Sequence, residues 1–475
     1  MIPATCRDRE FRAEDLFVTR RQFLNRAGAG FGALSLTSLV AMGLLEAPDA
    51  GAAVNSHSPL VPKKPHFPAK AKRVLQIFAS GAPSQIDTWD PKPALAKYND
   101  APMPDDKNAV GFASPFTFTK SGKSGIEASE VFPKLAGHVD EMAVVRSMYT
   151  DMPDHAAATL MMNTGSTRLV KPSVGSWITY GLGSDNQNLP GFISLSPGGI
   201  APENLRSAFL PGAFQGTPIN TSNTSVEKMI ENIKSRYTSL PEQRRQLDLL
   251  HKLNEVHAQN LKKDDKLEAR LQAYELAYQM QLEAMDAFDI SKETDKMREL
   301  YGATTPQGRQ MLIARRLLEK GVRFVQVWHG GWDHHNNLDT AMRARAGEID
   351  TPAAALLTDL KERGMLQDTL VIWGGEFGRS AAADRALLGG SPGRTHNGRA
   401  FSMWLAGGGI KGGTVYGKTD ELGDRAVENK VHIHDLHATV LATLGFDHEK
   451  LTYRYNGRDF RLTDVYGNVV KNILA

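Results

Sequence analysis

The chain has 475 residues, of which 41% are hydrophobic and 23% charged, a composition that excludes a disordered chain and a fibrous protein. Its 56 basic and 53 acidic residues give a formal net charge of +3, so we expect no nucleic-acid partner. Cys6 is the only cysteine, so the rest of the chain has no thiol for a disulfide, a thiolate metal site or covalent catalysis. Any bound metal would depend on His, Asp, Glu and Asn side chains.

Residues 1–52 are typical of a twin-arginine export signal peptide. The sequence "TRRQFL" at residues 19–24 precedes a segment rich in Gly, Ala and Leu, and small residues at 50–53 favour cleavage near residue 52. A membrane anchor is the alternative, because the apolar run is almost long enough to span a bilayer. We predict a periplasmic or secreted protein that uses the twin-arginine export machinery and keeps no stable membrane span after cleavage.

Short apolar runs alternate with helical patterns after a linker at residues 53–71. Strands are predicted at residues 73–78, 142–146, 192–195, 322–328, 369–373 and 401–405. Helices are predicted at residues 154–163, 306–320, 352–363 and 435–444. This alternation predicts one α/β domain at residues 72–475, with a mostly parallel central sheet and helices on both faces.

A charged, Gly-poor stretch at about 225–301 interrupts this alternation. Its apolar residues have helical spacing, which predicts an insertion of two or three helices. Such an insertion is more typical of a lid, a brace or an oligomer surface than of a catalytic element.

Polar side chains follow several predicted strands, at the edge where ligands of parallel α/β sheets gather. In "HGGWDHHNN", residues 329–337, Asp333 and His335 lie two residues apart on the loop after a strand, and this spacing lets both bind one cation. "VIWGGEFGRS" brings Glu376 and Arg379 directly after another strand, where a buried carboxylate needs a cationic partner.

Two further stretches add candidates. His396 lies in the glycine-flanked sequence "GRTHNG" before the strand at 401–405, and Asp87 follows the first predicted strand. Each candidate taken singly is most simply a hydrogen-bonded loop residue. Together, they predict a site for a divalent metal, with zinc preferred and manganese, iron or calcium as alternatives.

The stretch "PDHAAATLMMNTG" adds a different kind of candidate. Asp154 is a plausible N-cap, which would place His155 in the first turn of a helix. Free backbone N–H groups and the helix dipole favour an anion there, so a nucleophile or an anion-binding residue fits. The alternative is a capping aspartate followed by a packed histidine.

These stretches, in this order, resemble the family called domain of unknown function 1501, within the alkaline phosphatase/sulfatase superfamily. The resemblance covers nearly the whole chain after the signal, from "FASGAPSQIDTWDPKP" through "GVRFVQVWHGGWDHH" to "HIHDLHATVLATLG". It implies an alkaline phosphatase-like fold and a two-metal site that holds a phosphate or sulfate ester while Ser, Thr or formylglycine attacks. Asp333 and His335 resemble the Asp and His of one metal, and His396 resembles the His that completes its site.

The chain departs from the superfamily pattern at three places. Glu376 stands where the second metal site begins, but Phe377 replaces its histidine. His155 stands in the place of the nucleophile, and ordinary sulfatase chemistry is excluded because no cysteine or S-x-P-S-R run can become formylglycine. Asp87 is the nearest substitute for the aspartate that phosphatases carry after the first strand.

The resemblance and the residues together predict an exported, metal-dependent hydrolase of phosphate or related, sulfate-like esters, with a small-molecule or polysaccharide substrate. Arg379 would hold an anionic oxygen, and His155 is left with three roles: nucleophile, acid or base, or metal ligand while water attacks. The predicted metal ligands are Asp333, His335, His396, Glu376 and Asp87. The alternative is a non-catalytic surface protein that keeps the fold and binds a metal or a sulfated polysaccharide.

Overall fold

The structure is a computed structural model that describes residues 59–475 apart from 199–201, 231–232, 234–237, 261–264 and 385–390. The predicted signal peptide at 1–52 and the first part of the predicted linker lie outside the described residues. Within the described part of the chain, no helix is both long and apolar enough to cross a membrane.

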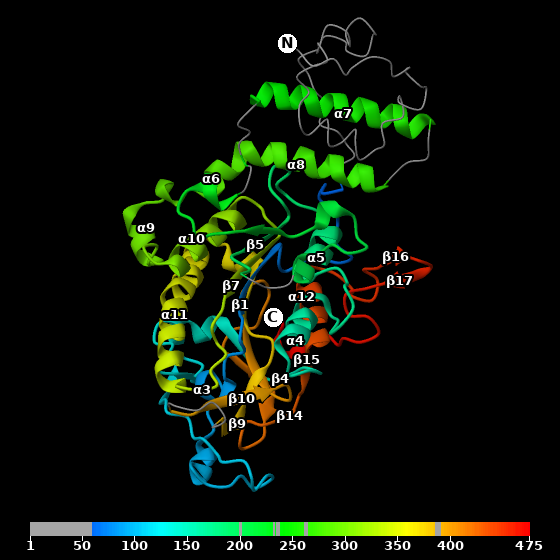
Figure 1. The fold of residues 1–475 in the computed structure, drawn as a ribbon. Coiled ribbons are helices and arrows are strands. Elements are labelled where there is room, and N and C mark those ends of the chain that lie inside the picture. Colours follow the sequence, from blue (N-terminus) through cyan, green and yellow to red (C-terminus); the bar gives the residue numbers. More distant parts are fainter. Residues whose placement is uncertain (1–58, 199–201, 231–232, 234–237, 261–264, 385–390) are drawn as a thin grey trace, which may run out of the picture. The chain divides into compact units, whose positions relative to one another are not determined.

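A nine-stranded sheet forms the centre of the fold, in the order β12-β4-β11-β8-β1-β7-β5-β6 with β15 beside β4 (Figure 1). Every strand except β11 runs in the same direction, because β11 is antiparallel to both of its neighbours and the other pairs are parallel. The predicted α/β class with a mostly parallel sheet is therefore confirmed. The strands are β1 Arg73–Ala79, β4 Met142–Tyr149, β5 Phe192–Leu195, β6 Thr217–Ile219, β7 Phe324–His329, β8 Thr369–Gly374, β11 Phe401–Ala406, β12 Thr414–Tyr416 and β15 Val431–His432.

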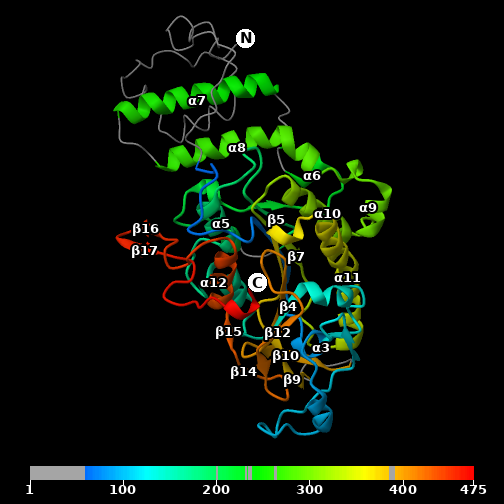
Figure 2. The ribbon, with the colours of Figure 1, turned by 180° about the vertical axis from the view of Figure 1, so that it is seen from behind.

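Helices cover both faces of this sheet (Figures 1 and 2). In β1, Leu75 and Ile77 belong to one buried cluster and Val74 and Phe78 to another, as strand alternation requires. Because both sets are fully buried, the strand reads as a continuous apolar run. The helices on the first face are α10 Pro306–Glu319 and α11 Leu338–Glu362, and those on the second are α4 His155–Thr164, α5 Val174–Leu182 and α12 Ile433–Thr443.

The prediction that a helix begins at Pro352 was wrong, because α11 begins at Leu338 and contains that proline in its interior. A proline inside a helix loses one backbone hydrogen bond, and burial of an apolar stripe offsets this cost. The residues of this stripe have helical spacing in the sequence, and each is at most 1% exposed. They are Leu338, Met342, Ala346 and Ile349.

Among its described residues, the stretch at 225–301 contains four α-helices: α6 Val226–Met229, α7 Leu240–Asn260, α8 Asp265–Ala287 and α9 Asp295–Leu300. Arg244 of α7 forms an ion pair with Glu275 of α8, 2.6 Å between Nη1 and Oε1, so these two helices pack side by side. Ala284 and Ala287 join the buried cluster on the α10 and α11 face of the sheet. The role of this segment as a lid, brace or oligomer surface remains a prediction.

A buried histidine joins α12 to α4. His437 donates a hydrogen bond from Nε2 to the carbonyl of Met162, 2.8 Å away, and burial lowers the pKa of His437 to about 3. An unfolded histidine has a pKa of about 6.5, so the unfolded chain binds more protons between pH 6.5 and 3. The contribution of His437 to stability is therefore present above pH 6.5 and is lost as the pH falls.

We expect the free energy of unfolding to fall by about 1.4 kcal/mol per pH unit on account of His437 as the pH drops from 6.5 to 4.5. His437→Gln keeps an N–H donor but cannot be protonated, so its unfolding free energy should fall less steeply. Urea unfolding of both proteins at pH 4.5, 5.5 and 6.5 measures this difference. Parallel pH profiles would show that His437 is not the buried neutral group described above.

Candidate metal centre

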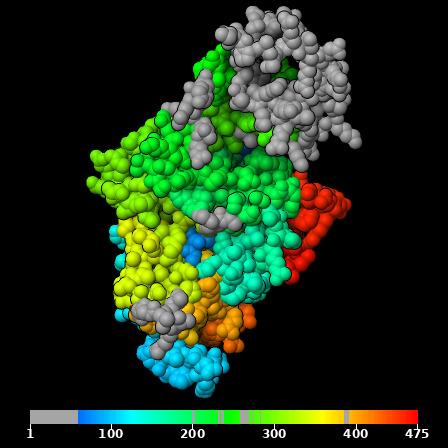
Figure 3. Space-filling model, viewed as in Figure 1, coloured from blue at the N-terminus to red at the C-terminus, as the bar shows by residue number. Residues whose placement is uncertain are grey.

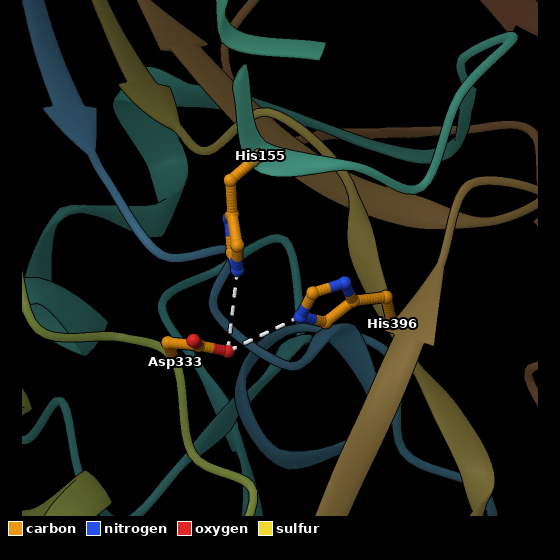
Figure 4. A group of neighbouring side chains, drawn as sticks. All are labelled: His155, Asp333 and His396. Carbon is orange, nitrogen blue, oxygen red and sulfur yellow. Dashed lines mark hydrogen bonds and ion pairs between the residues drawn. The ribbon is translucent and has the colours of Figure 1, made fainter. Parts of the chain in front are cut away.

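The parallel strands bring four side chains to one edge of the sheet. Asp333 and His335 lie on the loop after β7, and His155 is the first residue of α4, which follows β4. His396 lies on β10 Gly393–Asn397, which forms an antiparallel hairpin with β9 Gly378–Asp384 after β8. Figure 4 shows His155, Asp333 and His396 pointing toward one another from these separate elements.

One carboxylate oxygen, Oδ1 of Asp333, is the common neighbour of three imidazoles. It lies 3.3 Å from Nε2 of His155, 2.9 Å from Nε2 of His335 and 3.3 Å from Nε2 of His396. The Nε2 atoms of His335 and His396 are 3.0 Å apart. The structure thus brings together three of the predicted ligands, Asp333, His335 and His396, and adds His155 to them.

The Nδ1 atom of each of these imidazoles is hydrogen-bonded to an oxygen atom. Carboxylates and carbonyls accept hydrogen bonds, so each Nδ1 carries a hydrogen, and each ring, when it is neutral, presents the lone pair of Nε2 to the shared point. Metal-binding histidines commonly have this arrangement. The three bonds are His155 Nδ1 to Glu376 Oε1 (2.6 Å), His335 Nδ1 to Asp384 Oδ2 (2.8 Å) and His396 Nδ1 to Pro153 O (2.9 Å).

The donor set fits a divalent cation. Ligand atoms about 2.0–2.1 Å from zinc at tetrahedral angles stand roughly 3.3 Å apart, close to the separations of 2.9–3.3 Å seen around Asp333. Nε2 of His155 is buried and makes no hydrogen bond within the described part of the chain. The ligand atoms of His155, Asp333 and His396 all lie within 4.8 Å of one another, and His335 joins this group through its contacts with Asp333 and His396. Imidazole and carboxylate ligands of this kind suit zinc, whereas calcium takes six to eight oxygen ligands.

The charges of the cluster support the same interpretation. Burial lowers the pKa of His155, but its contacts with Asp333 and Glu376 outweigh burial and raise this pKa to about 9. Burial raises the pKa of Asp333, and contacts with His155 and Arg379 outweigh it and hold that pKa well below its usual range. A proton on His155 therefore balances the carboxylates when no cation does so, and a metal would displace it.

Arg379 was predicted to hold an anionic oxygen of a substrate, but the structure gives it protein partners. Its Nη2 lies 2.5 Å from Oδ1 of Asp333 and donates to the carbonyl of Gly81, and its Nε donates to the carbonyl of Ala82 at 2.9 Å. The side chain is 1% exposed. We therefore describe Arg379 as a residue that positions Asp333.

Glu376 was predicted as a metal ligand, but in the structure it contacts the cluster through the imidazole of His155. Its Oε1 accepts hydrogen bonds from Nδ1 of His155 and from the backbone N–H of Gly81, 3.0 Å away. The ring of Phe377 lies 4.8 Å from those of both His155 and His396, measured between centroids, and forms an apolar wall of the site.

Asp87, the fifth predicted ligand, is not brought to this cluster. Both of its oxygens face Arg394, with Oδ2 2.6 Å from Nε and Oδ1 3.1 Å from Nη2, and Ser84 donates to Oδ2 at 2.5 Å. Asp87 and Arg394 are fully buried. The carboxylate is neutralised by a guanidinium, so the assignment of Asp87 as a ligand is corrected to that of a buried ion pair.

Two anchoring groups were missed in the sequence. Asp384 ends β9 and holds His335, and the carbonyl of Pro153 holds His396. No spacing signal pointed to either, since 49 residues separate Asp384 from His335 and 243 separate Pro153 from His396. The face shown in Figure 3 is hollowed between the yellow segment that holds α11 and the teal segment that holds α4.

These observations define the class of the protein: an α/β protein with a histidine and carboxylate cluster at the carboxyl edge of a mostly parallel sheet. The family described as "Protein of unknown function (DUF1501)" matches residues 71–474, and the chain belongs to that family, as the sequence predicted. No curated protein matches the sequence.

Several solved structures are weakly similar to the chain. The PsFucS1 sulfatase from Pseudoalteromonas sp. is 15% identical with a TM-score of 0.34, over 82% of this chain and 69% of that one. The lipoteichoic acid synthase LtaP from Listeria monocytogenes is 10% identical with a TM-score of 0.36, over 84% and 76%. The alkaline phosphatase from the Antarctic bacterium TAB5 is 13% identical with a TM-score of 0.28, over 73% and 95%.

Proposed function

We propose that this protein is an exported, metal-dependent hydrolase of phosphate or related, sulfate-like esters. One observation carries the proposal: three imidazoles, each anchored through Nδ1, direct Nε2 to the same carboxylate oxygen of Asp333. Lone pairs that converge on one point repel one another unless a proton or a metal cation lies between them.

The proposed ligands are Asp333, His155, His335 and His396, with zinc as the preferred metal and manganese or iron as alternatives. When bound, a divalent cation supplies Lewis-acid polarisation of the ester and neutralises charge that develops during displacement. Of the three roles open to His155, its geometry supports that of a ligand, because Nδ1 is held by Glu376 and Nε2 points to the shared oxygen. Water is then the proposed nucleophile.

Glu376 and Arg379 act in this proposal through the ligands that they hold. Glu376 accepts from Nδ1 of His155 and fixes both the tautomer and the plane of that ring. Arg379 keeps Asp333 ionised and turned toward the histidines. Phe377 excludes water from one side of the cluster, which strengthens electrostatic interactions within it.

A second candidate function is binding without turnover, of a metal or of a sulfated polysaccharide. The burial of Arg379 favours this candidate, because its side chain is 1% exposed and each of its three nitrogens donates to an oxygen of the protein. A protein of this kind would keep the metal and the fold without the chemistry.

Metal analysis combined with an ester screen distinguishes the two candidates. We expect purified protein to hold a stoichiometric metal and to hydrolyse an aryl phosphate or an aryl sulfate, and His155→Ala to lower both metal content and turnover. Stoichiometric metal without turnover of either ester, and unchanged metal content in His155→Ala, would instead support the binding function.

Glu376→Gln should weaken metal binding about 10–100-fold, the usual cost of changing an outer partner of a metal-binding histidine, because the amide keeps the acceptor but loses the charge that makes the ring of His155 more basic. The amide oxygen still accepts from the backbone N–H of Gly81, so we expect the fold to be retained. Competition with a fluorescent zinc chelator measures the affinity, and exposed Glu428, which pairs with Lys418, provides the control Glu428→Gln. Equal weakening in both variants would remove Glu376 from this role.

Export depends on the "TRRQFL" sequence in this proposal. Replacing Arg20 and Arg21 together by lysine should keep the protein in the cytoplasm, because the export machinery reads the arginine pair. Fractionation followed by immunoblotting measures the distribution, and replacing Arg7 and Arg9, which lie outside the pair, is the control. Unchanged export of the double variant would contradict the predicted route.

A further inference from the structure

A cavity of about 360 Å³ opens beside the cluster, at the carboxyl ends of β5, β6 and β7. The residues that matter for its chemistry are Ser196, Thr221, Gln310, Trp328, Gly330 and Arg345. Gly331, which also lines the cavity, is two residues from Asp333, a separation of at most about 7 Å along the chain. The cavity and the metal centre thus share one loop.

The polar groups of the cavity wall are neutral and offer both donors and acceptors. The hydroxyls of Ser196 and Thr221 are 2.6 Å apart, and one bond between them uses one hydroxyl hydrogen, so the other remains to be donated. Gln310 gives its amide hydrogens to the carbonyls of Leu195 and Trp328, at 2.8 Å and 3.3 Å. Its Oε1 is left as an acceptor, although the side chain is buried.

An aromatic ring and a balanced charge complete the wall. Trp328 donates from Nε1 to the hydroxyl of Ser194, 2.8 Å away in the core, and its ring packs against that of Phe78, 4.4 Å between centroids, so it adds no free polar group to the wall. Arg345 is paired with Glu348, 2.8 Å between Nη1 and Oε2, and Glu348 also bonds His329 at 3.1 Å. The cavity therefore carries little net charge.

These features select among classes of ligand. A bare inorganic anion needs donors and positive charge, and a purely apolar molecule would leave the amide oxygen of Gln310 without a partner. The hydroxyl groups of a sugar both donate and accept, so they can bond the hydroxyls and the amide oxygen of this wall. A volume of about 360 Å³ accommodates a single ring, because ligand pockets start at about 300 Å³.

We infer that this cavity binds a saccharide ring and that the ring is the alcohol part of the ester presented to the metal centre. The role given to the ring rests on the proposed function, whereas binding of the ring does not. The binding of a saccharide and the hydrolysis of its ester are therefore separable in experiment.

Two glycines form the side of the cavity nearest to the metal centre, and they differ in what a side chain would meet. A Cβ at Gly331 would lie 3.0 Å from Nε of Arg345, and that residue has a φ of +89°, so substitution there would strain the loop. A Cβ at Gly330 would have no atom within 4 Å among the described residues. A large side chain at residue 330 can thus fill the cavity without displacing the backbone.

The test uses Gly330→Phe in the metal-loaded full chain, with the 6-sulfates and 6-phosphates of glucose and galactose as saccharide esters and methyl phosphate as an ester without a ring. The control is Gly137→Phe, at an exposed position where a Cβ also meets open space. We expect kcat/KM for the best saccharide ester to fall at least tenfold more than kcat/KM for methyl phosphate in Gly330→Phe, and both values to stay unchanged in Gly137→Phe. Gly330→Val is used if the larger variant does not fold.

Equal losses for saccharide esters and methyl phosphate, or no loss for either, would overturn the inference and leave the proposed function intact. If the wild-type protein hydrolyses no ester, the proposed function fails, and saturation-transfer NMR with the same sugar sulfates decides the inference. Binding that is lost in Gly330→Phe and kept in Gly137→Phe would support it. Absence of binding to the wild-type protein, or equal binding to all three proteins, would overturn it.

Discussion

Asp333→Asn is expected to remove the bound metal and, with it, ester hydrolysis. Oδ1 of Asp333 is the one atom within 3.3 Å of Nε2 in all three imidazoles, so it supplies the negative charge of the ligand set. An amide at this position keeps the shape but loses the charge, and the loss of affinity should exceed the roughly 10–100-fold cost of changing an outer partner. Elemental analysis of purified protein and an aryl ester assay measure both effects.

Asp339→Asn is the matched control for this substitution. Asp339 lies six residues further along the chain, is half exposed and pairs with Arg343 at the surface, 2.7 Å between Oδ1 and Nε. Its replacement should leave metal content and turnover unchanged, because exposed ion pairs contribute about 0–1 kcal/mol. His335→Ala should repeat the loss seen for Asp333→Asn. Normal metal content in either cluster variant would remove the proposed centre.

Asp87→Ala should destabilise the protein by about 3–5 kcal/mol without changing the metal content of the folded fraction. Arg394 is fully buried, and without Asp87 its guanidinium would keep hydrogen bonds to the carbonyls of Ser380 and Ala381 but would lose its counter-charge. An uncompensated buried charge is among the largest single sources of instability. Urea unfolding measures the change in the free energy of unfolding.

The exposed pair of Arg454 and Asp459, 3.2 Å apart, provides the comparison, and Asp459→Ala should cost at most about 1 kcal/mol. Loss of metal from Asp87→Ala at unchanged stability would contradict the structure and return Asp87 to the ligand set predicted from the sequence. The two variants together separate a structural carboxylate from a ligating one.

Most of the fold could be predicted from the sequence, because the spacing of the apolar residues indicates most of the strands and helices. The buried strands are continuous apolar runs, and each of the six predicted strands has a counterpart in the central sheet. The start of α11 was missed because a proline was given more weight than the apolar stripe that precedes it. Tertiary burial of that stripe outweighs the local preference of Pro352.

The candidate site could be predicted only in part, for a physical reason. Strand ends of a parallel sheet meet at one edge, so Asp333, His335 and His396 were expected to converge. The partner of a polar side chain is not fixed by that rule. Asp87 pairs with a residue 307 positions away, and Arg379 is held largely by backbone carbonyls, which have no signature in the sequence.

The most direct test of the metal centre is a crystal structure of protein purified with its native metal, with anomalous data collected at the absorption edge of that metal. We predict one anomalous peak about 2.0–2.2 Å from Oδ1 of Asp333 and from Nε2 of His155, His335 and His396. A stoichiometric metal bound elsewhere, or these four groups without an anomalous peak in protein kept saturated with zinc, would contradict it.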